Sequence, residues 1–329
     1  MRSNTPRGGW QMTSRIALIF LLSCLLVSSL VLGRARVQAV SGEATIFAEG
    51  VISTAEYESH PQFTPDGKVL YFVKSTPNFS FWTIVLSRFE NGKWSAPEVA
   101  PFSGQYSDAD PFITADGSRL FFISNRPAPG KTGRDLDIWV MEKTGTGWSE
   151  PRNPGPPVNS PGNEWFPTAT NYGTLYFGSD REGGKGRTDI YRCPMIDGKY
   201  SAAENLGENI NSPFGEFEPY IAPDESYLIF AAAGRQDGKG QFDLYLSHRR
   251  EGAWTKAVNL GDKINTAATE FAPKVSPDGK TFFFTSTRGF ADDPLTQRMS
   301  YQELSKRLKG TRNGLGDIYQ IDIKAVGIQ

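Results

Sequence analysis

Cysteine and histidine are nearly absent from the sequence, with two residues of each type in 329. Cys24 lies in a hydrophobic N-terminal run, so only Cys193 remains for the folded part, and neither a disulfide framework nor a cysteine-based zinc site can form. His60 and His248 lie far apart, and the chain has no HExxH, GxSxG or Walker motif. The sequence therefore predicts no cofactor and gives no sign of a common hydrolase or nucleotide site.

An excess of basic residues is missing as well. The whole chain has 35 Lys and Arg against 36 Asp and Glu. Residues 1 to 39 hold five arginines and no acid, so the rest of the chain carries 30 basic and 36 acidic residues. Nucleic-acid-binding proteins show the opposite balance. We therefore expect no nucleic acid partner.

The first 39 residues are typical of an export segment. Arginines without acids precede an apolar run at residues 16 to 32, and Val-Gln-Ala at residues 37 to 39 suits signal peptidase cleavage directly after it. Two alternatives stay open. The stretch that ends at Cys24 loosely resembles a lipidation motif, and the apolar run is near the length of an uncleaved membrane tether. In each case we expect the folded part to be exported, periplasmic or envelope-associated.

A short pattern recurs five times along the rest of the chain. Each copy has an acid three residues before a proline, then a turn sequence such as Asp-Gly and an aromatic-rich segment. The prolines are Pro61, Pro111, Pro167, Pro219 and Pro273. Their spacing of 50 to 56 residues is in the range of four-stranded propeller blades. In the first copy the strand signals cover residues 61 to 64, 69 to 74, 81 to 88 and 94 to 100.

The last copy has three strand signals before the chain ends, and residues 45 to 51 resemble the missing fourth strand. Each unit has two apolar faces, which stacking the units around an axis would bury. We therefore predict an all-β fold, a single β-propeller over residues 40 to 329. Five blades closed by the N-terminal strand are favoured over six. The blades are expected to begin near residues 58, 108, 164, 216 and 270.

The repeat resembles the PD40, or TolB-like, WD40-like propeller repeats of exported bacterial proteins. The fullest match is NEWFPTATNYGTLYFGSDREGGKGRTDIY at residues 163 to 191, echoed by INS at residues 210 to 212 and NLGDKINT at residues 259 to 266. That family includes Tol-Pal components and envelope-anchored proteins with peptidoglycan-binding partners. The resemblance implies a protein of the bacterial envelope whose partner is another envelope protein or a glycan such as peptidoglycan.

Strand parity separates the tight turns from the long loops. The loops from second to third strands, and those from a fourth strand to the next blade, lie on one side of the propeller, which we call face A. The repeated acids enter the innermost strands on this face, and they are Glu58, Asp108, Glu164, Glu216 and Glu270. They predict either an anionic ring for a cation, a basic peptide or an amine-bearing glycan, or a scaffold that ties each blade to the next. Whether the ring holds a metal ion stays open.

A second repeated pattern places an arginine after the second strand and an aspartate at the start of the third. The arginines are Arg126, Arg181, Arg235 and Arg288, and the aspartates are Asp137, Asp189, Asp243 and Asp317. Because arginine can bridge a carboxylate through two N–H groups, we expect these to be structural pairs. The first blade has Ser-Thr-Pro at residues 75 to 77 and Phe81-Trp82 instead, which predicts a more apolar stretch of face A.

Residues that the repeat does not dictate are stronger candidates for a ligand site. They flank the channel mouth beside the repeat prolines, and they are His60, Asp110, Trp165, Phe166, Phe217 and Glu218. Aromatic rings beside carboxylates suit sugars or peptide side chains, although packing between blades would use the same residues. We expect a non-catalytic binding or scaffold protein. The alternative is a carboxylate-dependent carbohydrate-active enzyme, a glycosidase or lyase, with acids at the channel mouth.

The last blade carries one large departure from the repeat, about 28 residues between the second and third strands. Residues 300 to 303 form a capping-box sequence, which predicts a short helix with one apolar face and a basic last turn. Two interpretations stay open: a lid that packs its apolar stripe on the rim, or an element that docks on an acidic partner or the membrane surface. The residues expected to make the docking contacts are Arg298, Tyr301, Lys306, Arg307 and Lys309.

Overall fold

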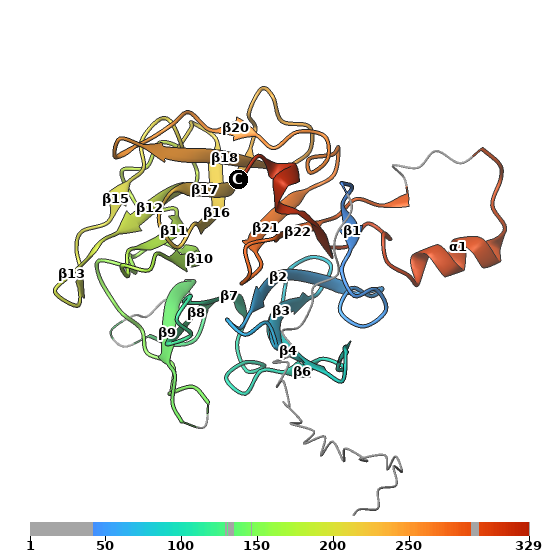
Figure 1. Cartoon of the computed structure of the whole chain (residues 1–329), viewed down its shortest axis with the longest axis horizontal. Coiled ribbons are helices and arrows are strands. Elements are labelled where there is room, and N and C mark those ends of the chain that lie inside the picture. The colour runs from blue at the N-terminus through green and yellow to red at the C-terminus, as the bar shows by residue number, and fades with distance from the viewer. Residues whose placement is uncertain (1–41, 129, 131–134, 146, 291–295, 329) are drawn as a thin grey trace, which may run out of the picture. The chain divides into compact units, whose positions relative to one another are not determined.

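The computed structural model describes residues 42–128, 130, 135–145, 147–290 and 296–328. The predicted export segment at residues 1 to 39 lies outside the described residues. Within the described part of the chain, no helix is both long and apolar enough to span a bilayer. The described residues belong to one compact unit, in which five antiparallel sheets are arranged around a common centre (Figure 1).

Each sheet is one blade, and its first strand lies nearest the centre (Figure 1). Blade 1 contains β2 (Tyr57–Phe63), β3 (Val69–Ser75), β4 (Trp82–Glu90), β5 (Lys93–Trp94) and β6 (Glu98–Val99). Blade 2 contains β7 (Asp108–Ile113), β8 (Arg119–Ser124) and β9 (Asp137–Glu142). Blade 3 contains β10 (Glu164–Ala169), β11 (Leu175–Ser179), β12 (Asp189–Cys193) and β15 (Glu204–Asn205), beside a small hairpin of β13 (Met195–Ile196) and β14 (Lys199–Tyr200).

Blade 4 contains β16 (Gly215–Ile221), β17 (Tyr227–Ala233), β18 (Asp243–Arg250), β19 (Ala253–Trp254) and β20 (Val258–Asn259). Blade 5 contains β21 (Glu270–Val275), β22 (Thr281–Ser286), β23 (Asp317–Asp322) and β1 (Thr45–Ile46), and a 3-10 turn follows at η2 (Ile323–Val326). Strand β1 pairs with β23, with Thr45 opposite Gln320. The predicted five-bladed, all-β propeller closed by an N-terminal strand is therefore confirmed.

The outermost strands are shorter than the sequence indicates. Residues 94 to 100 were expected to form one strand, but the structure has the two-residue strands β5 and β6 with a break between them. Pro97 lies in this break and has no N–H group for a sheet hydrogen bond. In blade 2 a single bridge between Val140 and Arg152 takes the place of a fourth strand.

The core lies between neighbouring sheets. The second strand of every blade contributes a fully buried phenylalanine, and these are Phe72, Phe122, Phe177, Phe230 and Phe283. The expected tight turns are present, since Gly67, Gly117 and Gly279 each adopt a positive φ near 70°. Cys193 is buried in the core and free. Burial of large aromatic side chains between blades thus stabilises the ring without a disulfide.

The insertion in blade 5 contains α1 (Tyr301–Leu308), which lies away from the sheets (Figure 1). The predicted capping box is present, because Ser300 accepts a hydrogen bond from the Glu303 backbone and Glu303 accepts one from the Ser300 backbone. No residue of α1 is buried, and Tyr301 is 82% exposed. The lid interpretation is therefore wrong, because the apolar stripe of the helix does not cover the rim.

Candidate functional site

Every innermost strand has a β-bulge at the residue before the repeat proline. The pairing register shifts at this point in each blade, and the bulged residue has a φ between 48° and 56°. The five bulged residues are His60, Asp110, Phe166, Glu218 and Ala272. A bulge breaks the strict alternation of a strand, so neighbouring side chains such as those of Phe217 and Glu218 both reach the same cavity. The bulges therefore place unlike side chains around the axis.

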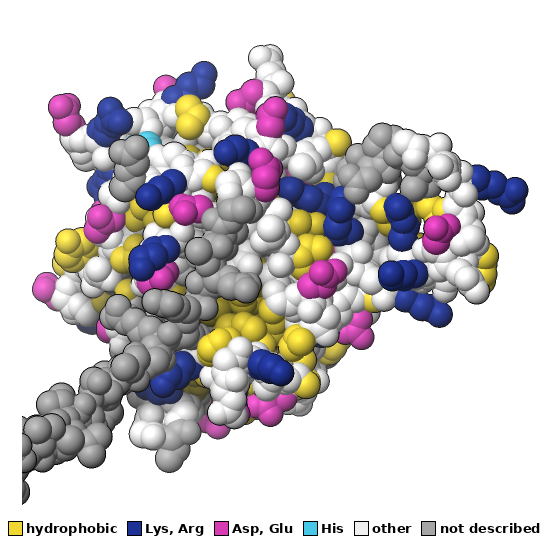
Figure 2. All heavy atoms as spheres, turned by 45° about the vertical axis from the view of Figure 1, so that its right-hand side comes forward, with side chains coloured by type: hydrophobic (Ala, Val, Ile, Leu, Met, Phe, Trp, Pro, Cys, Tyr) yellow, Lys and Arg dark blue, Asp and Glu magenta, His cyan; other side chains and the backbone are white. Residues whose placement is uncertain are grey.

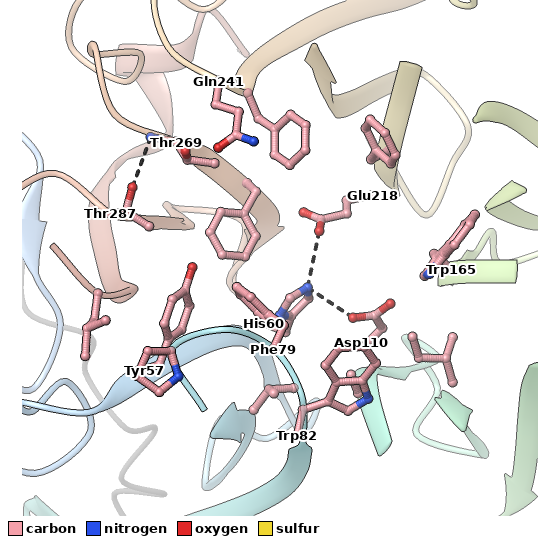
Figure 3. Close-up of a pocket in the computed structure, with 18 of the residues that line it drawn as sticks. Tyr57, His60, Phe79, Trp82, Asp110, Trp165, Glu218, Gln241, Thr269 and Thr287 are labelled. Atoms are coloured by element: carbon pink, nitrogen blue, oxygen red, sulfur yellow. Dashed lines mark hydrogen bonds and ion pairs between the residues drawn. The ribbon is translucent and has the colours of Figure 1, made fainter. Parts of the chain in front are cut away.

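A cavity of about 630 Å³ opens at the channel mouth among the long loops of face A. Blade 1 contributes Tyr57, Phe79 and Trp82, and the other blades contribute Trp165, Phe217, Phe242 and Phe271. The polar residues that line it include His60, Asp110, Glu218 and Gln241 (Figure 3). An apolar pocket with a few convergent polar groups is the usual form of a small-molecule or side-chain binding site. We call this cavity the face A pocket.

His60 lies between the two carboxylates at the floor of the face A pocket. Its Nε2 atom is 3.0 Å from Asp110 Oδ1 and 3.4 Å from Glu218 Oε1 (Figure 3). The other ring nitrogen, Nδ1, is 2.7 Å from the hydroxyl of Ser59. Asp110 also accepts a hydrogen bond from the Phe166 backbone, and Glu218 accepts one from the Ala272 backbone. These contacts link one blade to the next, and His60 connects blades 1, 2 and 4.

Burial and mutual charge shift the pKa values of this cluster. Burial raises the pKa of Asp110 to about 6, even though the nearby His60 opposes that change. Burial alone would lower the pKa of His60, but Asp110 and Glu218 outweigh it, so this pKa lies above its ordinary value of 6.5. The cluster therefore favours a protonated histidine between two acids, one of which gains a proton only slightly below neutral pH.

Lys274 lies beneath this cluster, inside the channel. Its ammonium group is 5.0 Å, 4.9 Å and 5.7 Å from the ring centroids of Phe112, Phe166 and Tyr220. Burial lowers the pKa of Lys274 to about 7, although Asp110 and Glu218 act in the opposite direction. Lys274 also lines a smaller cavity of about 160 Å³ among the tight turns of the other face. The side chains of His60, Asp110, Glu218 and Lys274 thus form a charged cluster that separates the two cavities of the channel.

The repeated acids do not line the face A pocket. The structure buries the side chains of Glu58, Asp108, Glu164, Glu216 and Glu270 completely. Each carboxylate accepts hydrogen bonds from the loop that leads in from the preceding blade, as from Thr54 to Glu58 and from Ser160 to Glu164. These acids therefore connect neighbouring blades and are out of contact with solvent.

The predicted arginine–aspartate pairing is wrong. The arginines instead pair with the repeated acids of their own blades: Arg126 with Asp108 at 2.8 Å, Arg181 with Glu164 at 3.1 Å, Arg235 with Glu216 at 2.9 Å and Arg288 with Glu270 at 3.4 Å. The aspartates of the third strands hold loops, as Asp189 does by accepting hydrogen bonds from the Lys185 and Gly186 backbones. In blade 1, Lys74 supplies the cation for Glu58 at 2.8 Å.

Of the residues singled out from the sequence, the structure brings five together in the face A pocket: His60, Asp110, Trp165, Phe217 and Glu218. Phe166 is buried and does not line the pocket. The apolar stretch expected in blade 1 is part of it through Pro77 and Trp82. The sequence analysis missed Tyr57, Phe79, Phe242, Phe271 and Lys274. Lys274 directly follows a repeat proline, where the other copies carry Gln62, Phe112, Thr168 and Tyr220, so its unlike character was a usable signal.

The insertion residues lie on the surface. Arg298, Lys306 and Lys309 are exposed, and Arg307 is half-buried with its guanidinium 5.4 Å from the ring centroid of Phe290. Figure 2 shows Lys and Arg side chains gathered on this projecting part of the molecule. Among the described residues, no cluster of three or more His, Cys, Asp or Glu side chains could hold a metal ion.

Comparisons with known proteins show the fold alone. No protein-family model matches the chain, and no curated protein matches it. An α-L-arabinofuranosidase from Podospora anserina is 12% identical, with 86% of this chain and 98% of that chain covered and a TM-score of 0.50. An α-L-arabinofuranosidase catalytic domain from Coprinopsis cinerea gives the same values. A TolB-like protein from Agrobacterium tumefaciens is 19% identical over 70% of each chain, with a TM-score of 0.46.

Proposed function

We propose that this protein is an exported, non-catalytic binding protein of the bacterial cell envelope, which holds a glycan or a segment of a protein partner in the face A pocket. The observation that carries this proposal is the pocket itself. A cavity of about 630 Å³ combines aromatic walls with unlike polar groups at the channel mouth. Rings of this kind offer large, rigid contact surfaces to sugars and to peptide side chains.

The contacts of the two pocket acids favour binding over catalysis. Both oxygens of Asp110 have a partner, His60 on one side and the Phe166 backbone on the other. Both oxygens of Glu218 are engaged in the same way, by His60 and the Ala272 backbone. A general acid must give its proton to the substrate, which here would require breaking contacts that join blades. We assign these acids to orientation of a bound ligand, and the five repeated acids to the scaffold.

Ligand capture by pocket variants tests this proposal. Trp165→Ala and Phe217→Ala should each reduce recovery of the partner from an envelope extract, or binding to an array of envelope glycans, by about tenfold or more. Tyr172→Ala is the matched control, because Tyr172 is 74% exposed and does not line the pocket. Equal capture by the wild type and both pocket variants would show that the pocket is not the binding site.

A carboxylate-dependent carbohydrate-active enzyme is the second candidate. One observation favours it: Asp110, with its pKa raised to about 6 by burial, and Glu218 lie on either side of a single nitrogen atom at the pocket floor. Glycosidases use two carboxyl groups about 5 to 10 Å apart. Hydrolysis of aryl glycosides that is lost in both Asp110→Asn and Glu218→Gln would establish this activity. No turnover by the wild type across a panel of such substrates would refute it.

The insertion around α1 is proposed as a contact for an envelope partner. Arg298, Lys306 and Lys309 are exposed. A cationic surface of this kind attracts acidic partners and anionic headgroups. Substituting all three by Glu should weaken partner capture without changing ligand binding in the pocket. Unchanged capture would remove the insertion from the interface.

A further inference from the structure

The charged groups around the face A pocket are mostly negative. The lining contains the carboxylates of Asp110 and Glu218 and the imidazole of His60, and none of the described lining residues is Lys or Arg. Glu218 is the more accessible acid, with 17% of its side chain exposed. Lys274 lies beneath these groups and does not line the pocket, so a ligand meets two carboxylates and the histidine between them. The lining is therefore more complementary to a neutral or positively charged ligand than to an anion.

Blade 1 contributes three aromatic rings to one wall of the face A pocket. The ring centroids of Tyr57 and Phe79 are 4.6 Å apart at an angle of 70°, and those of Phe79 and Trp82 are 6.3 Å apart at 62°. Phe217 and Phe242 of blade 4 form a second aromatic pair, with centroids 5.1 Å apart. Groups of aromatic rings attract cations through their negative faces, and more strongly when the cation leaves water.

Elsewhere in the propeller, a carboxylate and aromatic rings together hold a cationic side chain. In blades 2 to 5 an arginine lies between a buried acid and aromatic rings of the same blade. Arg126 pairs with Asp108 and lies 4.7 Å from the ring centroid of Phe122, and Arg288 pairs with Glu270 and lies 4.8 Å from that of Tyr319. The sequence thus repeatedly uses an acid and a ring to hold a cation.

Blade 1 departs from this arrangement. Its second strand ends at Ser75 and is followed by Thr76 instead of an arginine, and Lys74 already pairs with Glu58 away from the pocket. No described Lys or Arg lies over the rings of Tyr57, Phe79 or Trp82. Phe79 is 39% exposed, which is unusual for a phenylalanine. Among the described residues, the rings of blade 1 therefore have no counterpart of the arginine that the other blades supply internally, and the cation beside Glu218 is His60 at 3.4 Å.

The pKa of the Tyr57 hydroxyl depends on burial and on the nearby charge of Glu218. Burial raises the pKa of Tyr57, and the negative charge of Glu218 raises it further. Burial disfavours any charged group at this point, so only the contribution of Glu218 to this pKa favours a cation here.

We propose that the face A pocket recognises an organic ammonium group, which lies between the rings of Tyr57, Phe79 and Trp82 and the carboxylate of Glu218. Primary amines, as in an amino sugar or a lysine side chain, and quaternary amines, as in choline, share this chemistry. The inference rests on the proposed function, since it names the chemical class of ligand for the same pocket. The remaining aromatic rings then contact the part of the ligand that carries the ammonium group.

Matched probe pairs test the proposal on the full-length protein, with binding followed by tryptophan fluorescence and calorimetry. Choline is compared with 3,3-dimethylbutan-1-ol, which has the same shape and no charge, and glucosamine is compared with glucose. We expect the charged member of at least one pair to bind at least tenfold more tightly. The pair that shows the preference distinguishes a quaternary from a primary amine.

Two variants test whether Glu218 and Phe79 cause the preference for the charged probe. Glu218→Gln should abolish the discrimination between charged and neutral probes, and Phe79→Ala should weaken binding of the cation at least fivefold. Tyr172→Ala should leave both unchanged. Melting curves identify a variant that fails to fold, and Trp82→Ala then replaces it, because the Trp82 ring contacts Phe79 at the rim of the pocket.

The outcomes separate this inference from the proposed function. Equal affinity for both members of each pair, with glycan or partner capture still sensitive to Trp165→Ala, would overturn the ammonium site and leave the binding function intact. Tighter binding of an anionic probe such as glucuronate would overturn it in the same way. If no probe binds and capture is insensitive to pocket substitutions, both proposals fail.

Discussion

The buried acids of the repeat give the sharpest stability prediction, and Glu270→Gln is the most informative change. The Glu270 side chain is fully buried. Its carboxylate accepts hydrogen bonds from the Thr266 backbone at 2.9 Å, the Thr266 hydroxyl at 2.7 Å and the Ser286 hydroxyl at 2.6 Å. Arg288 donates a further one at 3.4 Å. Glutamine has the same shape but replaces one acceptor oxygen with a donor and removes the charge.

The expected loss in the free energy of unfolding follows from these contacts. A donor that loses its acceptor inside the protein costs about 1 to 3 kcal/mol, and removing one partner of a buried ion pair costs about 3 to 5 kcal/mol. Arg288 keeps a second hydrogen bond, to the Ile264 carbonyl, and its side chain is 15% exposed, so it is partly compensated. We therefore expect Glu270→Gln to lower the free energy of unfolding by about 2 to 4 kcal/mol.

Urea unfolding followed by tryptophan fluorescence measures this difference. Glu208→Gln is the matched control, because it makes the same chemical change on a side chain that is 88% exposed. That control should change the free energy of unfolding by less than about 0.5 kcal/mol. If Glu270→Gln costs no more than the control, the repeated acids are not scaffold residues, and a ligand-binding role for them must be reconsidered.

Three further predictions concern other parts of the fold. Deleting residues 42 to 54 removes β1 together with the buried side chains of Phe47 and Ile52. The melting temperature should therefore fall sharply, and light scattering should detect aggregation through the exposed edge of β23. An unchanged melting curve would refute closure by this strand. Burial lowers the pKa of Lys274 from 10.5 to about 7, so the folded state binds the ammonium proton less tightly than the unfolded state does. The resulting loss in the free energy of unfolding is complete below pH 7 and disappears as the pH rises towards 10.5. Lys274→Met should therefore raise the melting temperature more at pH 6 than at pH 9, and an equal change at both values would contradict this reasoning. The Phe290 backbone donates a hydrogen bond to the Arg312 carbonyl, so a short Gly-Ser turn can replace residues 291 to 311; because α1 buries no residue, the melting temperature should change by less than about 3 °C, and a larger loss would show that the insertion stabilises the blades.

The sequence predicts the propeller well because its determinants are local and repeated. Turn glycines, alternating strand segments and the spacing of the repeat prolines all act within one blade. The closing strand could be identified because a missing fourth strand at one terminus matched a spare segment at the other. The short outer strands were harder to predict, since Pro97 interrupts the pairing of a segment that otherwise has strand character.

The wrong pairing of the arginines shows what linear spacing leaves undetermined. In blade 3, Ser179 lies opposite Glu164 on one side and opposite Asp189 on the other. Arg181 follows two residues later, so both carboxylates are near its backbone. Asp189 is not available to the arginine, because it already accepts hydrogen bonds from the Lys185 and Gly186 backbones and from the Asn205 amide. Glu164 remains as the acceptor for the arginine.

The bulge before each repeat proline was beyond prediction for a physical reason. A residue that precedes proline favours extended conformations, and a positive φ is uncommon for residues other than glycine. The structure nevertheless places all five of these residues at a φ near 50°. Glycine would adopt this backbone without strain, yet none of the five positions carries it. The surrounding structure must therefore hold this backbone, and Asp110 and Glu218 contribute by accepting hydrogen bonds from the bulge of the next blade. Since the strained backbone is common to all blades while the residue type differs at each, this position is where the propeller can acquire an asymmetric site.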